Sequence, residues 1–531
     1  MNKLHITLYL LLVNFTAVYL QDDITINDVE VVKAFDAKLI EAKKIPISPV
    51  IPDTNIPAPN YNYDVNIIPL DLTYPDPIIR PLAMKPDPRN EPKMAWLKGG
   101  FGTLVRPYLD LGYNIFIEDL YNASLFAHYE GGQQTMDEDI FRSYSDFSID
   151  LEGAYFLLPK MSVYSHIGFN KRNRSLGTTD SLYQSFSSFF VGGGIKNPEA
   201  LNDKLFYNIG LDFHLNKEQA EDITETIITL PANIAYEFSD MGLFSVSNTL
   251  EFSKALDTYD AGVVNQLNAS IKNTRGAFSY ALGGDVIQGS DQRSIFPSVL
   301  LSYAIMDNKV NVELGSDQSY YRYNIEGLFN ANPYFLFSES NDEINISRNI
   351  FLGANGKISN LSFSGRGGYK LLSNIYSFVK NDSAAITFTN SNNENNKSTA
   401  VYLEGNLLYE WQDWLSISGN ISQHFYNSDI ELYHLPSLEA RTKLIITGNK
   451  SKWHFYSTLQ FIDKVTALNI TDQTTVDLNN QIDFSLGGDY FIIENLGLYL
   501  EANNLFSNNY ERWQGYKDFG SNFYGGIKLK F

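Results

Sequence analysis

The last twelve residues of the chain, 520–531, read GSNFYGGIKLKF. Counted back from the end in steps of two, one set of positions holds Phe531, Leu529, Ile527, Gly525 and Phe523. The positions between them hold Lys, Gly and Tyr. Successive side chains of a β-strand point to opposite faces. The alternation therefore predicts a strand with one apolar face and one mostly polar face, ending on an aromatic carboxy-terminal residue.

A strand of this kind is typical of the closing strand of a transmembrane β-barrel. There the apolar face, here Phe523, Ile527, Leu529 and Phe531, meets lipid, and the chain end pairs with the first strand. The alternative is an ordinary edge strand of a soluble sheet. The rest of the chain has to decide between them.

The same alternation recurs from about Trp96 to the end of the chain. Leucine, isoleucine, valine and aromatic residues oppose a face of Ser, Asn, Gly, Asp and Glu, as a wet barrel lumen requires. We therefore predict an all-β fold, an antiparallel transmembrane barrel over 95–531 with about 22 strands (range 16–22). The candidate lumen-facing charged residues are Asp212, Glu251, Arg366, Glu404 and Glu501.

Two features favour the membrane over a soluble β-sandwich array, which would show the same alternation. Aromatic residues collect near predicted strand ends, as interfacial girdles do. The breaks also alternate in length, so we expect short periplasmic turns and longer external loops. The short turns are Pro159-Lys160, Met306-Asp307-Asn308, Ser359-Asn360, Gln412-Asp413 and Glu494-Asn495, and the longer polar stretches are 171–183, 323–346, 381–397 and 464–476.

Composition narrows the class of protein further. The chain has 531 residues, no cysteine, and a formal net charge of -21, which argues against a nucleic-acid partner. Without cysteine there is no disulfide framework, thiol nucleophile or site for lipoprotein acylation. The mean hydropathy of -0.20 is too polar for a helical membrane protein. A barrel fits this value, because its hydrophobicity lies in alternation.

The amino-terminal part reads as two further segments. Residues 1–20 predict a signal peptide for Sec export, with an early Lys3 and an apolar run from Leu8 to Leu20. Residues 21–94 predict a periplasmic arm, because 46–92 holds 12 of the chain's 19 prolines. Proline at this density favours an extended, polyproline-like segment. We expect a tether, or an arm that docks a partner or enters the barrel mouth.

Catalytic and metal-binding motifs do not emerge from the sequence. The seven histidines show no metal-ligand spacing, and the glycines Gly192 to Gly194 lie within a strand pattern. We therefore expect no enzyme activity and no cofactor.

The segment 498–510, LYLEANNLFSNNY, followed by Gly520 and the closing strand, resembles the carboxy-terminal end of TonB-dependent receptors. The matching residues are Asn504, Leu505, Phe506, Tyr510, Gly520 and Phe531. The segments 29–46 and 79–82 resemble plug-less receptor-like barrels of the Bacteroidota. The resemblance implies a barrel in the outer membrane of a Gram-negative cell. The chain departs from the family before the barrel. There the proline-rich residues 22–94 leave no room for a plug domain, and they show no convincing TonB box.

Two functions follow as expectations. The first is transport of a solute across the outer membrane. The second is a structural or scaffold barrel with an occluded lumen in a larger outer-membrane assembly. The expected partners are outer-membrane lipid and lipopolysaccharide, and a periplasmic or outer-membrane protein that binds through residues 22–92.

Overall fold

The computed structural model describes residues 94–531, apart from short gaps at 105, 118–119, 138–139, 159–160, 177–182, 198–203, 239–241, 256–258, 291, 336, 338–343, 383–385, 391–396, 449–450 and 508–509. The predicted signal peptide and nearly all of the predicted arm lie outside the described residues and stay predictions. The first strand begins at Ala95.

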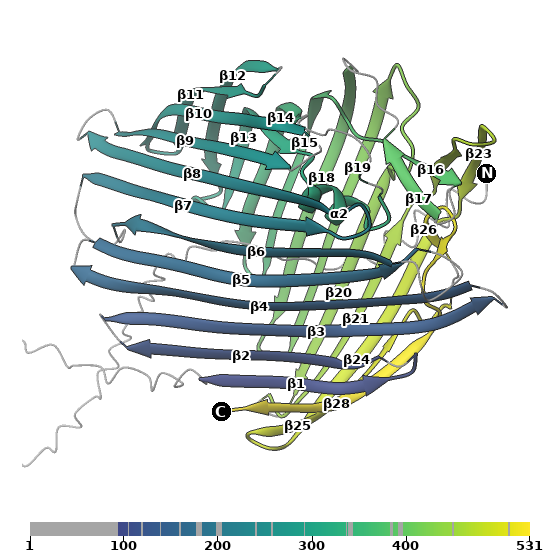
Figure 1. Cartoon of the computed structure of the whole chain (residues 1–531). Coiled ribbons are helices and arrows are strands. Elements are labelled where there is room, and N and C mark those ends of the chain that lie inside the picture. Colours follow the sequence, from purple (N-terminus) through teal and green to yellow (C-terminus); the bar gives the residue numbers. More distant parts are fainter. Residues whose placement is uncertain are drawn as a thin grey trace, which may run out of the picture. The chain divides into compact units, whose positions relative to one another are not determined.

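Twenty-two antiparallel strands form one closed sheet, which confirms the predicted fold (Figure 1). Each strand pairs with the next one along the wall, and β28 pairs with β1 from Trp96↔Lys530 to Gly102↔Tyr524. The wall strands are β1 (Ala95–Gly102), β2 (Tyr108–Ile117), β3 (Tyr121–Asp137), β4 (Ile140–Leu158), β5 (Met161–Ser175), β6 (Tyr183–Lys196), β7 (Leu205–Glu218), β8 (Ile223–Phe238), β9 (Gly242–Ala255), β10 (Tyr259–Arg275), β11 (Phe278–Gln288), β12 (Arg293–Ile305), β13 (Val310–Arg322), β14 (Ile344–Ile358), β15 (Leu361–Ser373), β18 (Lys397–Trp411), β19 (Leu415–Ser428), β20 (Leu438–Gly448), β21 (Trp453–Ile462), β24 (Gln481–Ile493), β25 (Leu496–Asn503) and β28 (Asn522–Lys530).

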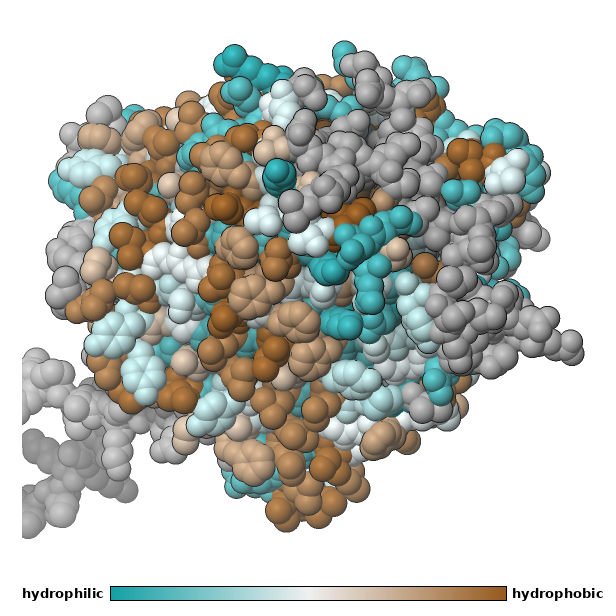
Figure 2. Space-filling model, viewed as in Figure 1, coloured by the Kyte–Doolittle hydropathy of each residue, from teal (hydrophilic) through white to brown (hydrophobic). Residues whose placement is uncertain are grey.

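Alternation along each strand separates an apolar outer face from a polar inner face. Leu211, Leu403 and Leu500 are among the many large apolar side chains that remain exposed. Figure 2 shows apolar side chains over much of the visible wall. Exposed apolar surface of this extent needs an apolar environment, which lipid supplies. Within the described residues, no helix has the length and hydropathy to span a membrane.

One end of the barrel, the short-turn end, carries tight connections and the carboxy terminus. The predicted turns at Ser359-Asn360, Gln412-Asp413 and Glu494-Asn495 lie there between paired strands. Met306, Asp307 and Asn308 join β12 to β13 with positive φ angles of 52°, 56° and 64°. The Pro159-Lys160 turn lies outside the described residues. By the rule for bacterial barrels, short turns face the periplasm.

At the opposite end, which we name the long-loop end, part of the sequence prediction is wrong. Four stretches predicted as plain loops contain regular structure. β5 continues to Ser175 within 171–183, and α2 (Ile325–Ala331) and the start of β14 lie within 323–346. The stretches 381–397 and 464–476 contribute to a four-stranded sheet of β16 (Phe378–Asp382), β17 (Ile386–Asn390), β22 (Val465–Asn469) and β23 (Thr474–Leu478). β16 and β17 form one local hairpin, β22 and β23 form another, and the single parallel pair Lys380↔Asn469 joins them into one sheet. A further small pair, β26 (Glu511–Trp513) and β27 (Tyr516–Lys517), lies between β25 and β28.

Candidate functional site

All five predicted lumen residues lie on the inner face of the wall. Each alternates along its strand with exposed apolar residues such as Leu211, Phe252, Leu403 and Leu500. Arg366 on β15 lies directly opposite Glu404 on β18 in the strand register. The other three residues, Asp212, Glu251 and Glu501, lie on β7, β9 and β25, apart from this pair.

The acidic residues on the inner face are compensated by cations from neighbouring strands. Glu404 accepts from Lys370 at 2.8 Å, with His424 at 3.7 Å. Arg366 lies 3.9 Å from Glu313. Sequence reasoning missed these partners, because each comes from another strand and only the register of the closed sheet brings it near.

Two further lumen carboxylates are paired in the same way. Asp212 lies 3.2 Å from the Nε2 atom of His166. Glu251 lies 3.1 Å from the guanidinium of Arg322. Glu404 and Glu251 therefore each have a cationic partner, and Asp212 has an imidazole beside it.

Glu501 belongs to a polar network beside the barrel closure. It accepts from Lys98 at 2.8 Å and from the hydroxyl of Tyr456. The ammonium of Lys98 also lies 4.6 Å and 4.7 Å from the ring centroids of Tyr108 and Tyr499, within cation–π range. Lys98 precedes Glu501 by 403 residues, so the network exists only once the barrel is closed.

A second pair of contacts continues this network. Asp489 accepts from Lys528 at 2.6 Å and lies 2.8 Å from the Nδ1 atom of His454. Together these residues line a cavity of about 740 Å³, to which Arg441 and Lys443 of β20 also contribute. Cations, carboxylates and tyrosines on one cavity wall form a surface that can hold a polar solute by hydrogen bonds and ring stacking.

The long-loop end is closed over part of the lumen by a cluster that we name the aromatic cap. Three loops supply it, and Phe186, Ile223 and Ala255 of the wall pack against it. The loop residues are Tyr323, Ile325, Leu328, Phe329, Phe335, Phe337, Tyr376, Phe378, Trp513 and Tyr516, all buried.

Ring contacts hold the aromatic cap together across loops. Phe329 of α2 stacks on Phe186 of β6 at 5.1 Å between centroids. Tyr334 stacks on Tyr516 at 3.6 Å. Phe378 meets Trp513 edge to face at 5.3 Å. Such aromatic pairs add roughly 0.5–1.5 kcal/mol each beyond the area they bury.

Polar contacts fasten the aromatic cap to β4, β5 and β6. Arg142 of β4 donates to the carbonyl of Gly515 at 2.5 Å and lies 4.3 Å from the ring centroid of Tyr516. Gln184 of β6 donates to the carbonyl of Phe335 at 3.1 Å. The hydroxyl of Tyr516 donates to the carbonyl of Leu176, which follows β5, at 3.1 Å.

α2 is a short helix with a polar start and an apolar side. The side chain of Asn324 caps it by accepting from the amide of Gly327 at 2.7 Å. The amide of Ile325 donates to Glu225 of β8 at 3.3 Å, and Glu326 lies 3.9 Å from His214 of β7. Both partners lie on the inner wall, so the helix is anchored within the barrel mouth.

A buried histidine joins two loops of the cap. The Nδ1 atom of His434, in the β19–β20 connection, lies 3.0 Å from the carbonyl of Phe378, and its Nε2 atom accepts from the amide of Gln514 at 3.4 Å. This arrangement requires the neutral ring with its proton on Nδ1. Burial lowers the pKa of His434 to about 4, and the nearby cation Arg512 adds to the effect.

The residues of the family-like turn support the loop between β25 and β28. Asn504 is buried with a φ of 46° and donates from its side chain to the carbonyl of Phe519 at 2.9 Å. The amide of Leu505 donates to the carbonyl of Phe484, and Phe506 stacks on the ring of Phe484 at 5.4 Å.

Tyr510 lies further along the same loop. Burial and the neighbouring carboxylates of Asp518 and Asp483 raise the pKa of Tyr510. The turn is therefore built around hydrogen bonds and ring packing, which accounts for its residue types.

On the closing strand β28, Phe523, Ile527 and Phe531 are exposed, and Leu529 is half-buried on the same side of the strand. Tyr524 and Lys528 point the other way, and Lys528 lies over the ring of Tyr499 at 5.7 Å. The side chains thus divide as the alternation in 520–531 predicts.

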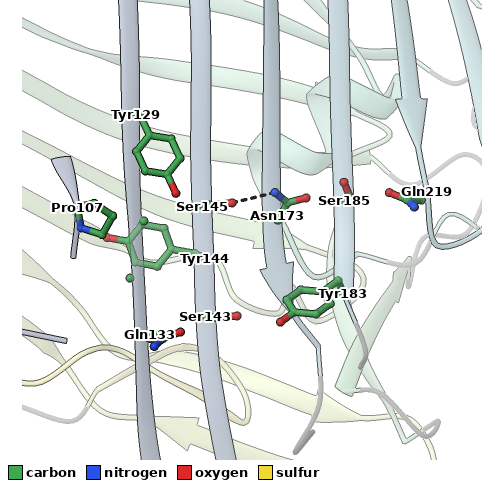
Figure 3. A pocket seen from close by; sticks show the side chains of 12 residues that line it. Pro107, Tyr129, Gln133, Ser143, Tyr144, Ser145, Asn173, Tyr183, Ser185 and Gln219 are labelled. Carbon is green, nitrogen blue, oxygen red and sulfur yellow. Dashed lines mark hydrogen bonds between the residues drawn. The ribbon is translucent and has the colours of Figure 1, made fainter. Parts of the chain in front are cut away.

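A second cavity of about 750 Å³ lies along β3 to β6 toward the long-loop end (Figure 3). Small residues such as Gly131 and Ser145 line it between Tyr129 and Tyr183. Asn173 donates to the hydroxyl of Ser145 at 2.8 Å, as Figure 3 shows. By register most of its lining side chains continue the face of the exposed Leu109 and Phe147, the outer face of the wall, whereas Tyr144 lies on the inner face.

No cluster of three or more histidine, aspartate or glutamate side chains suited to a metal ion occurs among the residues that the structure describes.

No protein-family model matches the sequence, and no curated protein matches it. Solved structures do. The chain is similar to the ferric enterobactin receptor PfeA of Pseudomonas aeruginosa, with a TM-score of 0.60 and 12% identity over 82% of this chain and 80% of that one. It is also similar to P. aeruginosa FpvA bound to heterologous pyoverdines, with a TM-score of 0.62 and 13% identity over 82% of this chain and 71% of that one. The ferripyoverdine receptor of the same outer membrane, bound to ferripyoverdine, aligns with a TM-score of 0.59 and 14% identity over 82% of this chain and 71% of that one. At these identities the likeness establishes the fold alone, a 22-stranded β-barrel like that of these receptors.

Proposed function

We propose that the chain transports a solute across the outer membrane, through the barrel lumen and past the aromatic cap. The observation that carries this proposal is the closed barrel of 22 strands, with a polar, charge-paired inner face. A wall of this kind offers a solute hydrogen-bonding partners along its path, whereas a purely structural barrel needs none. The receptors that share the fold support the same interpretation. The comparisons give no support to the scaffold alternative.

We further propose that residues 1–20 direct Sec export and that residues 21–94 form a periplasmic arm instead of a folded plug domain, as in the Bacteroidota-type barrels that the sequence resembles. Proline density in 46–92 supports the second point. In this proposal the aromatic cap limits passage through the barrel. Outer-membrane lipid and lipopolysaccharide surround the wall, and a protein partner binds the arm.

Single-channel conductance in planar bilayers tests the proposal. The purified full chain and a variant lacking residues 22–92 are compared. Conductance in the full chain indicates a passive pore, and conductance that appears only after the deletion makes the arm a gate. If both proteins stay silent, and liposomes containing either one also exclude small sugars, the transport proposal is wrong.

Charge reversal in the lumen gives a second test. Glu404→Lys removes the partner of Lys370 and places a second cation beside it. We expect the reversal potential in a salt gradient to move toward anion selectivity. Asp472→Lys, an exposed change in the connection between β22 and β23, is the matched control and leaves the reversal potential unchanged. Identical selectivity in the two variants would show that ions do not pass Glu404.

A further inference from the structure

The wall is not continuous over its whole height between β12 and β13. The two strands pair over seven positions, from Ile305↔Val310 to Val299↔Ser316. Beyond that point β12 stays paired with β11 as far as Arg293, and β13 stays paired with β14 as far as Arg322. Among the described strands, none pairs with the other edge of residues 293–298. The sheet therefore splits toward the long-loop end.

The burial of β13 and β14 shows which way they turn. Along one face of β13, Val312 and Leu314 are 44% and 45% exposed, whereas Gln318 and Arg322 are 5% exposed. Along the corresponding face of β14, Leu352 is 63% exposed and Ile346 is 1% exposed. The face that meets lipid near the short turns is therefore covered beyond the split.

What covers this face is the inner wall of β9 to β11. Ile344 and Ile346 pack with Val264 of β10 and Ile287 of β11 in one buried cluster, joined by Tyr320. Val264 alternates with the exposed Val263, so its side chain points into the lumen.

Polar contacts support the same placement. Gln318 donates to the backbone carbonyl of Asp285 at 2.8 Å. Arg322 and the hydroxyl of Tyr320 reach Glu251 at 3.1 Å and 3.4 Å. Residues 317–322 and 344–349 thus lie inside the barrel, against its own wall. We name this overlap the lapped seam.

The residues at the split favour the separation of β12 from β13. Pro297 has no amide proton to donate to a neighbouring strand, and its carbonyl accepts from the hydroxyl of Ser316 at 3.0 Å. Gly315, which precedes the last paired residue Ser316, lies under the ring of Phe351, where any β-carbon would meet the ring. A strand without side-chain bulk at this point bends more freely than its neighbours.

The separated segments match each other in length and register. Residues 293–298 and 317–322 each contain six residues, and the register of Val299↔Ser316, if continued without a shift, would pair Arg293 with Arg322. Pairing there would satisfy the backbone groups of both edges, a strong requirement near lipid. It would also return Ile344 and Ile346 to the outer face, in line with Ile350 and Leu352.

The hairpin also carries the main part of the aromatic cap. The connection from β13 to β14 includes Tyr323, α2 and Phe335. A movement of residues 317–322 to the edge of β12 would therefore withdraw α2 from the inner wall of β6 to β8.

We propose that the outer half of the β13–β14 hairpin is a lid. In the closed state it lies lapped inside the barrel, and in the open state residues 317–322 pair with 293–298 and draw α2 out of the mouth. The lid rests on the proposed transport function, since it regulates access to the same lumen. The contacts of Gln318, Tyr320 and Arg322 with the inner wall hold the closed state.

Engineered disulfides test the lid cleanly, because the chain has no cysteine of its own. Ile295→Cys with Tyr320→Cys reports the open state, since these positions face each other only when the register of β12 and β13 is continued. In the closed state Ile295 is 67% exposed on the outer face, whereas Tyr320 packs inside. Ser294→Cys with Gln318→Cys, joined by a short bis-maleimide, reports the closed state, in which the two native side chains share a hydrogen bond of 2.7 Å.

The proposal expects both pairs to cross-link in the folded, membrane-inserted full chain, each single-cysteine variant folding like the wild type. Oxidation of the 295/320 pair should raise the conductance of the variant lacking residues 22–92 several-fold, and reductant should reverse the rise. Cross-linking of 294/318 without any 295/320 disulfide would show that the seam is fixed and overturn the lid. A 295/320 disulfide that leaves conductance unchanged, in a protein that conducts, would overturn its role as a gate. Absence of conductance in every variant defeats the transport proposal instead, while the cross-linking yields still decide whether the hairpin moves.

Discussion

His434 shows how one side chain links the stability of the cap to pH. Its ring is neutral in the folded protein, with Nδ1 donating to Phe378 and Nε2 accepting from Gln514. Protonation would remove that acceptor and place a cation near Arg512. Because the folded pKa of about 4 lies below the ordinary value of 6.5, the unfolded cap binds the proton more tightly, and the cap loses stability as the pH falls between these two values. Each tenfold difference in proton affinity between the folded and unfolded ring corresponds to about 1.4 kcal/mol.

We expect hydrogen exchange at 376–378 and 511–516, corrected for the intrinsic pH dependence, to be faster at pH 4.5 than at pH 7. His434→Asn keeps a donor toward Phe378 but cannot be protonated in this range, so it should remove most of the acceleration. Equal acceleration in both proteins would assign the effect to other groups, such as the carboxylate of Glu439 beside Arg512.

At the scale of the element, the two faces of a wall strand differ in how well they tolerate a charged side chain. Leu500 in the middle of β25 is exposed on the outer face, and its neighbours in register are Gly525 and Gly488. Thr458 of β21 lines the lumen cavity. An arginine on the lipid face near the bilayer midplane costs roughly 2–4 kcal/mol, whereas a lumen position remains hydrated.

Leu500→Arg should therefore lower the urea midpoint for unfolding from lipid vesicles, and Thr458→Arg should leave it nearly unchanged. Tryptophan fluorescence measures both. Equal losses in the two variants would mean that β25 does not face lipid at this level.

The strands also show how much of the fold could be predicted from the sequence. Alternation identified both faces of the strands, the barrel and about 22 strands, because the side-chain period of two is local. It failed at 381–397 and 464–476, where β16 pairs with β17, β22 pairs with β23, and the single pair Lys380↔Asn469 joins the two hairpins. It also could not reveal the lapped seam, since Leu314 and Gln318 keep the same parity while their surroundings change from lipid to wall. The sequence also did not reveal the partners of the lumen carboxylates, such as Lys98 for Glu501, because they lie on other strands.

At the scale of the whole molecule, the part of the wall that the structure describes has a weak line between β12 and β13. β12 is paired on both sides from Val299 to Ile305, but on one side only from Arg293 to Ser298. Amide hydrogens with no ladder partner exchange at the lowest opening cost. We expect 293–298 to exchange faster than 299–305 and faster than the β1–β28 junction, as mass spectrometry of the protein in lipid nanodiscs would resolve. Uniform protection along β12 would indicate that residues 293–298 are paired on both sides in solution.

The junction of β1 with β28 has a consequence for the order of folding. Trp96 pairs with Lys530 at the far end of the sequence, so the ring of hydrogen bonds cannot be completed until the last strand has formed. Bringing ends this far apart together is slow compared with forming each local hairpin. During that interval the edges of β1 and of the last finished strand stay open, with an apolar face beside them, and such edges pair readily with other chains. We therefore expect closure by the terminal strand to be the last step in assembly of the barrel.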